Sequence, residues 1–243
     1  MWKLFFEICD FLCVLIPNKK LRDKIRTENL YDWKNKYKAL KDKYPTLDFR
    51  KTKMIKGGWN IGFIVDKKYV FKIRKSFDNS LPTDKIEREK RITDAFADIS
   101  PLRIPKIEII KAGKYVFFKY DFIPGKNLNT FSSHKIKQNK EKWGKQLAEF
   151  IYAIHNHNPK EINDLKGENI GDGWNHNDIC NNIIVNKKTM NIIGIIDWEY
   201  SGWGLLETEF INCVKFSEKI KSSGILPIIK HKYKKLYTTN KKT

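Results

Sequence analysis

Residues 174–210 are WNHNDICNNIIVNKKTMNIIGIIDWEYSGWGLLETEF, and this stretch decides the fold. It predicts a tight loop with Asp178, a strand over 183–186, a turn, and a second strand over 192–196 that leads to Asp197. Two carboxylates are therefore expected at the two ends of a hairpin. Such an arrangement suits phosphoryl transfer, in which a protein positions a hydroxyl group and holds Mg²⁺ against the phosphates.

Two segments of this stretch, HNDICNNIIV and IIDWEY, resemble the catalytic and metal-binding hairpin of the aminoglycoside phosphotransferase and choline kinase superfamily. Its members are distant relatives of the protein kinases. The resemblance implies that Asp178 is the catalytic base, which accepts the proton of the acceptor hydroxyl. It also implies that Asn182 and Asp197 are magnesium ligands and that His176 braces the loop. Either aspartate alone would be an ordinary turn residue, but the combination favours a kinase.

The loop departs from the family pattern in one place. The family has its asparagine five residues after the aspartate, and that position is occupied here by Ile183. Either the loop is one residue shorter, so that Asn182 takes the role, or Asn181 and Asn182 share it. A shortened loop is also the feature that would favour a catalytically silent protein of the same fold.

Residues 49–74 predict three antiparallel strands, with a hairpin at Gly57 and Gly58. Glycines at such a turn let backbone N–H groups approach phosphates. Lys72 lies in the middle of the strand YVFKIRK, where the family has a Lys or Arg that binds the nucleotide phosphates. The implied partner is Glu89 on the following helix, with Glu87 as the alternative and two solvated surface charges as the simpler interpretation.

Two more strands are expected over 107–110 and 115–121, followed by YDFIPGKNL. This segment resembles the family's hinge, Glu-Tyr-Ile-Pro-Gly-x-x-Leu. The resemblance implies that the backbone of residues 121–123 binds the adenine of ATP; the residues are Asp121, Phe122 and Ile123. An amphipathic helix is predicted over 142–157, and Glu209 stands where the family has a structural aspartate.

The resemblance covers residues 50–212 and implies an α+β, two-lobed protein-kinase-like fold. Its small lobe is an antiparallel sheet and its large lobe is mainly helical. We expect an amino-terminal helical extension over 1–45, a small nucleotide-binding lobe over 46–121, and a large catalytic lobe over 122–243.

The composition supports a folded protein with anionic partners. Of 243 residues, 41% are hydrophobic, which is enough for a packed core. The formal charge of +20 implies attraction to anions, although the general richness in Lys and Asn makes only clustered charge informative. Four cysteines without paired spacing suggest neither a zinc site nor a disulfide framework, so a reducing cytosol is expected.

The amino-terminal segment has two interpretations. Residues 2–16 are apolar but too short and too charged to span a bilayer, and the basic segment PNKKLRDKIR follows them. An apolar helix beside a basic cluster suits an anchor on an anionic membrane surface, and the opening loosely resembles that of bacterial enzymes that assemble lipopolysaccharide. A helix packed on the body of the protein is the equal alternative. We expect a cytoplasmic protein, located at the inner face of the cell membrane if the anchor binds.

The leading hypothesis is an ATP- and Mg²⁺-dependent kinase that phosphorylates a sugar hydroxyl in lipopolysaccharide or lipooligosaccharide biosynthesis. The basic stretch after residue 229 suits a glycolipid or another anionic small-molecule acceptor, and no nucleic acid is expected. Choline or ethanolamine kinase and aminoglycoside phosphotransferase remain alternatives in the same reaction class. A catalytically inactive, membrane-binding protein is the alternative from another class. The oligomeric state stays open.

Overall fold

The computed structural model describes residues 12–13, 15–18, 21, 32–56, 60–74, 83–168 and 170–240. The chain divides into two compact units, one of residues 1–83 and 108–122 and the other of residues 84–107 and 123–243. Most of the predicted amino-terminal anchor lies outside the described residues, as do Gly57 and Gly58. No helix within the described ranges is long and apolar enough to cross a membrane.

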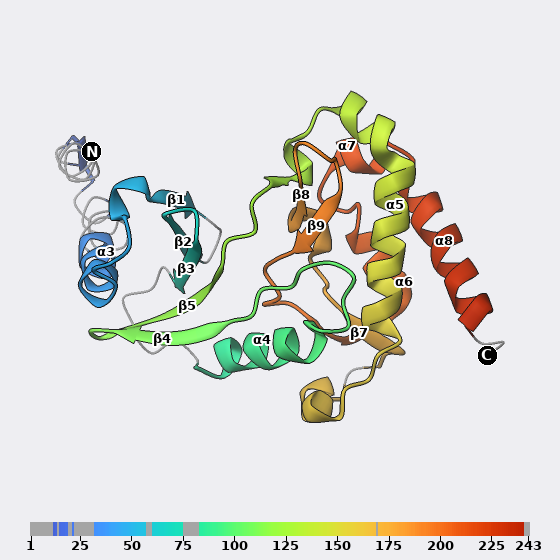
Figure 1. The fold of residues 1–243 in the computed structure, drawn as a ribbon, viewed down its shortest axis with the longest axis horizontal. Helices are drawn as coiled ribbons and strands as arrows, with labels where there is room; N and C mark the ends of the chain where they lie inside the picture. Colours follow the sequence, from blue (N-terminus) through green and yellow to red (C-terminus); the bar gives the residue numbers. More distant parts are fainter. Residues whose placement is uncertain are drawn as a thin grey trace. The chain divides into compact units, whose positions relative to one another are not determined.

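The first unit is built on a five-stranded antiparallel sheet with strand order β1-β2-β3-β5-β4 (Figure 1). All five strands were expected from the sequence. Their bounds are β1 Lys53–Lys56, β2 Asn60–Val65, β3 Tyr69–Arg74, β4 Glu108–Ala112 and β5 Tyr115–Asp121. Strand β2 is buried along its whole length, which explains its nearly continuous apolar sequence NIGFIV.

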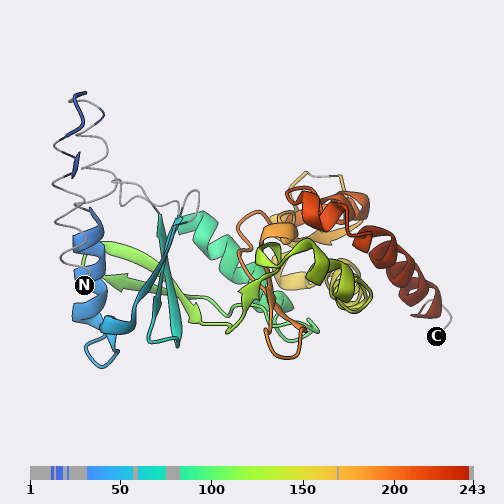
Figure 2. The same cartoon turned by 90° about the horizontal axis from the view of Figure 1, so that it is seen from above.

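Helix α3 (Asp32–Lys43) contacts strand β4 and contributes to the core of the first unit (Figure 2). Leu40 is fully buried, and it belongs to one cluster with Phe63 and Phe71 of the sheet. Tyr37 of the same helix donates a hydrogen bond of 2.8 Å to the carbonyl oxygen of Phe49. The part of the amino-terminal region that the structure describes as α3 therefore packs on the sheet.

The second unit is mainly helical. Its long helices are α4 (Thr83–Phe96), α5 (Ser133–His155) and α8 (Ile225–Asn240), with the shorter α6 (Leu206–Asn212) and α7 (Glu218–Lys221) between the last two. Two small sheets complete it, with strand orders β6-β8-β9 and β10-β7. Their strands are β6 Lys126–Asn127, β7 Gly173–Asn175, β8 Ile183–Val185, β9 Ile192–Ile195 and β10 Gly202–Gly204. The hairpin predicted from the sequence is β8 and β9.

Helix α5 begins nine residues before the predicted start at residue 142. The hydroxyl of Ser132 accepts a hydrogen bond from the backbone N–H of Lys135 and caps the helix. The first turns are almost entirely polar, so the apolar stripe that predicts the helix begins only later. Ile136 is the buried side chain that attaches these polar turns to the core.

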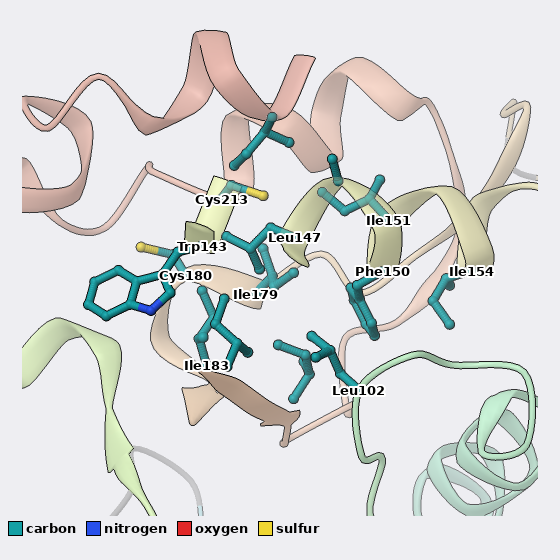
Figure 3. Close-up of a cluster of buried hydrophobic side chains, with 14 of the residues drawn as sticks. Leu102, Trp143, Leu147, Phe150, Ile151, Ile154, Ile179, Cys180, Ile183 and Cys213 are labelled. Carbon is teal, nitrogen blue, oxygen red and sulfur yellow. The ribbon is translucent and has the colours of Figure 1, made fainter. Parts of the chain in front are cut away.

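The core of the second unit lies between α5 and the segment that carries the predicted catalytic residues. Figure 3 shows Ile179, Cys180 and Ile183 with Leu147 and Phe150 of α5 in this cluster. Ile179, Cys180 and Ile183 are completely buried. Because protein cores are closely packed, burial of these side chains holds the loop in one position.

Candidate active site

The predicted catalytic loop, residues 176–182, connects β7 to β8. Asn177 has a positive φ of 66°, which turns the chain sharply after His176. A short 3₁₀ turn follows, η5 (Ile179–Asn181), whose apolar residues enter the core. Asp178 precedes this turn and stays partly exposed. The local sequence thus leaves the carboxylate of Asp178 partly exposed, while the apolar residues that follow it are buried in the core.

Both carboxylate oxygens of Asp178 have an amide partner. The side-chain nitrogen of Asn181 lies 3.4 Å from Oδ1, and that of Asn182 lies 3.1 Å from Oδ2. Asn182 also donates to the backbone oxygen of Asp178, at 2.8 Å. Asn181 and Asn182 therefore both contact the aspartate, and which of them takes the metal-binding role of the family's asparagine stays a prediction.

The pKa of Asp178 is raised, chiefly because partial burial disfavours the charged form. The hydrogen bonds from Asn181 and Asn182 oppose this effect, whereas the charge of Asp197 adds to it. The two aspartates are therefore close enough to interact electrostatically. A carboxylate with a raised pKa is a stronger proton acceptor than an ordinary aspartate.

Asp197 follows β9 and has a positive φ of 65°, a conformation that costs free energy in a non-glycine residue. The preceding residue, Ile196, forms hydrogen bonds through both its backbone N–H and its carbonyl group. The backbone N–H of Ile196 donates to the oxygen of Asn182 at 3.0 Å, and the carbonyl of Ile196 contacts the ring nitrogen Nε2 of His176, also at 3.0 Å. These contacts join the catalytic loop to the position of Asp197, and they give His176 the bracing role predicted for it.

The residue after Asp197 is fixed as well. Trp198 is completely buried, and its ring packs 4.8 Å from the ring of His176. Its backbone N–H donates to Oε1 of Glu89 at 3.1 Å. Glu89 of α4 is thus a buried carboxylate that touches the segment carrying Asp197, a contact that the sequence analysis did not anticipate.

Lys72 lies on β3 in the first unit, and its side chain is only 8% exposed. Its ammonium nitrogen is 5.7 Å from the centre of the Phe118 ring, within range of a cation–π interaction. Burial of a lysine in a strand supports a specific role for it. The pairing of Lys72 with Glu89 remains a prediction.

One backbone group of the predicted hinge already has a partner. The backbone N–H of Phe122 donates to the carbonyl of Lys68 at 2.7 Å, so this donor is already used inside the first unit. In an extended segment the neighbouring residues direct their polar groups to the opposite side. The expectation for Asp121, Phe122 and Ile123 therefore narrows to the carbonyl of Asp121 and the N–H of Ile123.

Glu209 of α6 supports the catalytic loop from within the protein. It is 2% exposed, and its two carboxylate oxygens accept hydrogen bonds from the backbone N–H groups of His176 at 3.3 Å and Asn177 at 2.9 Å. Burial raises the pKa of Glu209 to about 7. These contacts are what a structural aspartate would provide, as the sequence predicted for this position.

Two asparagines that the sequence analysis missed complete the loop. Asn129, in η3 (Leu128–Thr130), donates to Oδ1 of Asn181 at 2.8 Å and to the carbonyl of Cys180 at 3.1 Å. Asn127 donates to the backbone oxygen of Asn181. Both follow the hinge in the segment KNLNT, where two closely spaced asparagines were the available signal.

The donor types at this site fit a magnesium ion. Because Asn182 uses its nitrogen for Asp178, its side-chain oxygen is the atom that remains to bind a ligand. The amide oxygen of Asn182 and the carboxylate of Asp197 are hard oxygen ligands, which Mg²⁺ prefers. Magnesium sites in proteins often have only one or two carboxylate ligands, so this small set is sufficient. Among the described residues there is no cluster of three or more His, Cys, Asp or Glu side chains that could hold a metal.

Comparison with known proteins agrees with this geometry. A model of the phosphotransferase enzyme family matches residues 169–239, the segment that contains Asp178, Asp197 and Glu209. No curated protein matches the sequence.

Several solved structures share the fold at low sequence identity. ADP-bound aminoglycoside phosphotransferase APH(2'')-Ib has a TM-score of 0.61 and 14% identity over 81% of this chain and 81% of that one. The GDP complex of wild-type aminoglycoside 2'-phosphotransferase-IIIa has a TM-score of 0.61 and 13% identity over 82% and 86%. Macrolide 2'-phosphotransferase MphH from Brachybacterium faecium has a TM-score of 0.61 and 11% identity over 83% and 83%.

The predicted two-lobed α+β kinase-like fold is thereby confirmed. The predicted resemblance to the aminoglycoside phosphotransferase superfamily is confirmed by the family model over residues 169–239, and the solved structures agree with it in fold.

Proposed function

We propose that this chain, with the phosphotransferase pattern over residues 169–239, transfers the γ-phosphate of ATP to a sugar hydroxyl in lipopolysaccharide or lipooligosaccharide biosynthesis. The observation that carries the proposal is the environment of Asp178. Its carboxylate is held by two amides, is partly buried, and interacts with the charge of Asp197. A phosphotransferase that forms no covalent intermediate needs one carboxylate to position the acceptor hydroxyl and another to bind the metal ion.

The proposed reaction is a direct displacement. The acceptor oxygen forms a bond to the γ-phosphorus, the bond from that phosphorus to the bridging oxygen of ATP breaks, and ADP leaves. Asp178 takes the proton from the acceptor hydroxyl, and Asn181 and Asn182 keep its carboxylate in position. Asn182 and Asp197 would hold Mg²⁺, which when bound supplies positive charge that neutralises the phosphates.

The nucleotide is assigned to groups of the first unit and the hinge. ADP and GDP are bound in the similar solved structures, which supports a nucleotide substrate. We propose that Lys72 binds its phosphates, and its pairing with Glu89 remains a prediction from the sequence. The carbonyl of Asp121 and the N–H of Ile123 bind the adenine, because the N–H of Phe122 already donates to Lys68.

Aminoglycoside phosphorylation is the second candidate, and the similar solved structures favour it. One of them is a gentamicin complex of APH(2")-IIa, with a TM-score of 0.58 and 15% identity. The charge of this chain is the argument against a polycationic acceptor, because a formal charge of +20 repels such drugs. Parallel transfer assays with kanamycin and with lipooligosaccharide distinguish the two.

The decisive variant for the enzymatic proposal is Asp178→Asn. The amide keeps the shape but cannot accept the proton, so we expect kcat to fall by about a hundredfold or more while the Kd for ATP stays within a factor of about two. The measurement is transfer from labelled ATP to lipooligosaccharide, choline, ethanolamine and kanamycin. Asp98→Asn, at an exposed aspartate paired with Lys106, is the matched control. Unchanged turnover in Asp178→Asn would refute the assignment of the base.

A further inference from the structure

The guanidinium of Arg88 is a charged group of the second unit to which no role has yet been assigned. Arg88 lies on α4, immediately before Glu89, in the same unit as residues 176–182. It is partly buried, and burial lowers its pKa with no acidic group to oppose the effect. Among the interactions of the described residues, none gives Arg88 a carboxylate partner. A buried charge without a partner costs free energy, and a bound anion would offset that cost.

The space beside Arg88 is shaped by a glycine. A methyl group placed on Gly202 would lie 3.3 Å from Nη2 of Arg88 and 3.9 Å from Nδ2 of Asn177. Two N–H donors thus lie within 4 Å of the Cβ position of Gly202, which is itself buried. Gly202 pairs with Asn175 across β10 and β7, so the position of this glycine is set by the sheet.

Both donors have hydrogens to offer. Asn177 donates through Nδ2 to the carbonyl of Tyr200 at 3.0 Å, which uses one of the two hydrogens of the amide. Arg88 carries a planar fork of N–H groups that matches phosphate and carboxylate oxygens two at a time. The amide of Asn177 and the guanidinium of Arg88, which lie close together beside Gly202, form a cradle for an oxyanion.

One residue of the cradle belongs to the same loop as the proposed base. Asn177 precedes Asp178 in the chain, and its backbone N–H is held in place by Glu209 at 2.9 Å. Tyr200, whose carbonyl orients the amide of Asn177, is 54% exposed and leaves an aromatic ring at the surface. If the hydroxyl of an acceptor binds at Asp178, other groups of the same acceptor can therefore reach Asn177 and Arg88.

We propose that Arg88 and Asn177, which meet beside Gly202, bind an anionic group of the acceptor, either a phosphate or a carboxylate. The inference rests on the proposed function and narrows it: the acceptor is an acidic saccharide that already carries negative charge next to the hydroxyl to be phosphorylated. Arg88 is then a specificity-determining residue. A polycationic acceptor would bring amines to an uncompensated guanidinium and is disfavoured.

Binding is measured by calorimetry so that the result does not depend on turnover. The probes are inorganic phosphate, galactose 6-phosphate, galacturonate and neutral galactose, each with and without saturating ADP and Mg²⁺. We expect at least one anionic probe to bind about ten- to a hundredfold more tightly than galactose, as hydrogen bonds to charged groups allow. A response to galactose 6-phosphate or to galacturonate distinguishes a phosphate from a carboxylate.

Four variants locate the binding. Arg88→Gln should remove the preference for the anionic probe, and Arg88→Lys should restore part of it, because lysine keeps the charge but not the fork. Gly202→Ala should weaken binding as well, since its methyl group fills the cradle. Arg103→Gln is the matched control, because it removes one arginine with an exposed side chain from the same unit. Thermal melting confirms that each variant folds.

The outcomes separate this inference from the proposed function. Equal binding of the anionic probes to the wild type and Arg88→Gln would overturn the inference, and so would displacement of the probe by ADP, which would assign Arg88 to the nucleotide. If neutral acceptors are phosphorylated and no anionic probe binds, the inference fails and the kinase assignment stands. Arg88-dependent binding without transfer from ATP to any acceptor would support the cradle and contradict the kinase assignment.

Discussion

At the scale of single residues, the site is determined by how each polar group is satisfied. Asp178 has an amide on each carboxylate oxygen, and Asp197 is held in an unfavourable backbone conformation by hydrogen bonds of its neighbour Ile196. Glu209 is the buried counterpart of these two partly exposed acids. It accepts two backbone N–H groups of the catalytic loop, so the shape of the loop depends on one carboxylate in the core.

The stability of the protein should fall as Glu209 ionises. Its pKa is about 7 in the folded state against an ordinary 4.5, so the folded protein retains a proton that the unfolded chain loses. The stabilising effect of that proton is complete below about pH 4.5 and is lost as the pH rises through about 7. The contribution amounts to at most about 3 kcal/mol. Chemical unfolding between pH 5 and pH 8, compared with Glu209→Gln, measures it.

Glu207→Gln is the control for this comparison, because Glu207 lies on the same helix with an exposed side chain. We expect Glu207→Gln to follow the pH dependence of the wild type. A Glu209→Gln variant with the same pH dependence as the wild type would show that Glu209 titrates as an ordinary glutamate.

At the scale of secondary-structure elements, the closest packing in the second unit is between α5 and α8. Gly144 lies at this contact, and a methyl group on it would come within 2.6 Å of Cγ2 and 3.1 Å of Cβ of Ile228. The Cβ of Ile228 is fixed to the backbone of α8, and its branched side chain has few other χ1 rotamers, so neither close atom can move away easily. The glycine in the interior of α5 is therefore explained by the approach of α8, in spite of the low helix propensity of glycine.

Gly144→Ala should destabilise the protein by about 1–3 kcal/mol, the usual cost of overpacking, reduced by the gain in helix propensity. Ile228→Ala in the same chain should remove the 2.6 Å clash with Cγ2 and leave only the tight contact with Cβ at 3.1 Å, so the double variant should be more stable than the sum of the single changes predicts. A double-mutant cycle of unfolding free energies measures this coupling. Additive changes would mean that α5 and α8 pack less closely than the structure shows.

At the scale of the whole molecule, two units with separate cores are joined by the hinge around residues 121–123 and by the connections to α4. The sheet unit contains Lys72, and the helical unit contains the acids, Asn182 and Arg88. The positive charge of the chain is spread over both units, and a formal charge of +20 raises the local concentration of anionic substrates.

Salt should therefore weaken substrate binding more than catalysis. Raising the salt concentration from about 0.1 M to about 1 M shortens the Debye length from about 10 Å to about 3 Å, which screens attraction to ATP. We expect the KM for ATP to rise several-fold while kcat changes by less than a factor of about two. Steady-state kinetics across this range, with melting curves at each concentration, provide the test. A KM that is independent of salt would contradict a role for the overall charge.

The sequence by itself determined the hairpin, the strands of the sheet unit and the residue types of the site. Each of these depends on local pattern: alternation of apolar residues, turn residues between strands, and two short apolar runs with one carboxylate before the first and another after the second. The pattern did not determine where α5 begins, because its first turns are polar and are attached by a hydrogen-bonding cap and Ile136.

Only the tertiary structure decided how the site is supported. The contact of Glu89 with Trp198 joins residues 109 positions apart, and Asn129 reaches Asn181 across 52. Burial of Glu209 and the unpaired position of Arg88 beside Gly202 likewise depend on which elements pack together. Local sequence sets backbone preferences over a few residues, whereas burial and long-range hydrogen bonds arise only when distant segments meet in the folded chain.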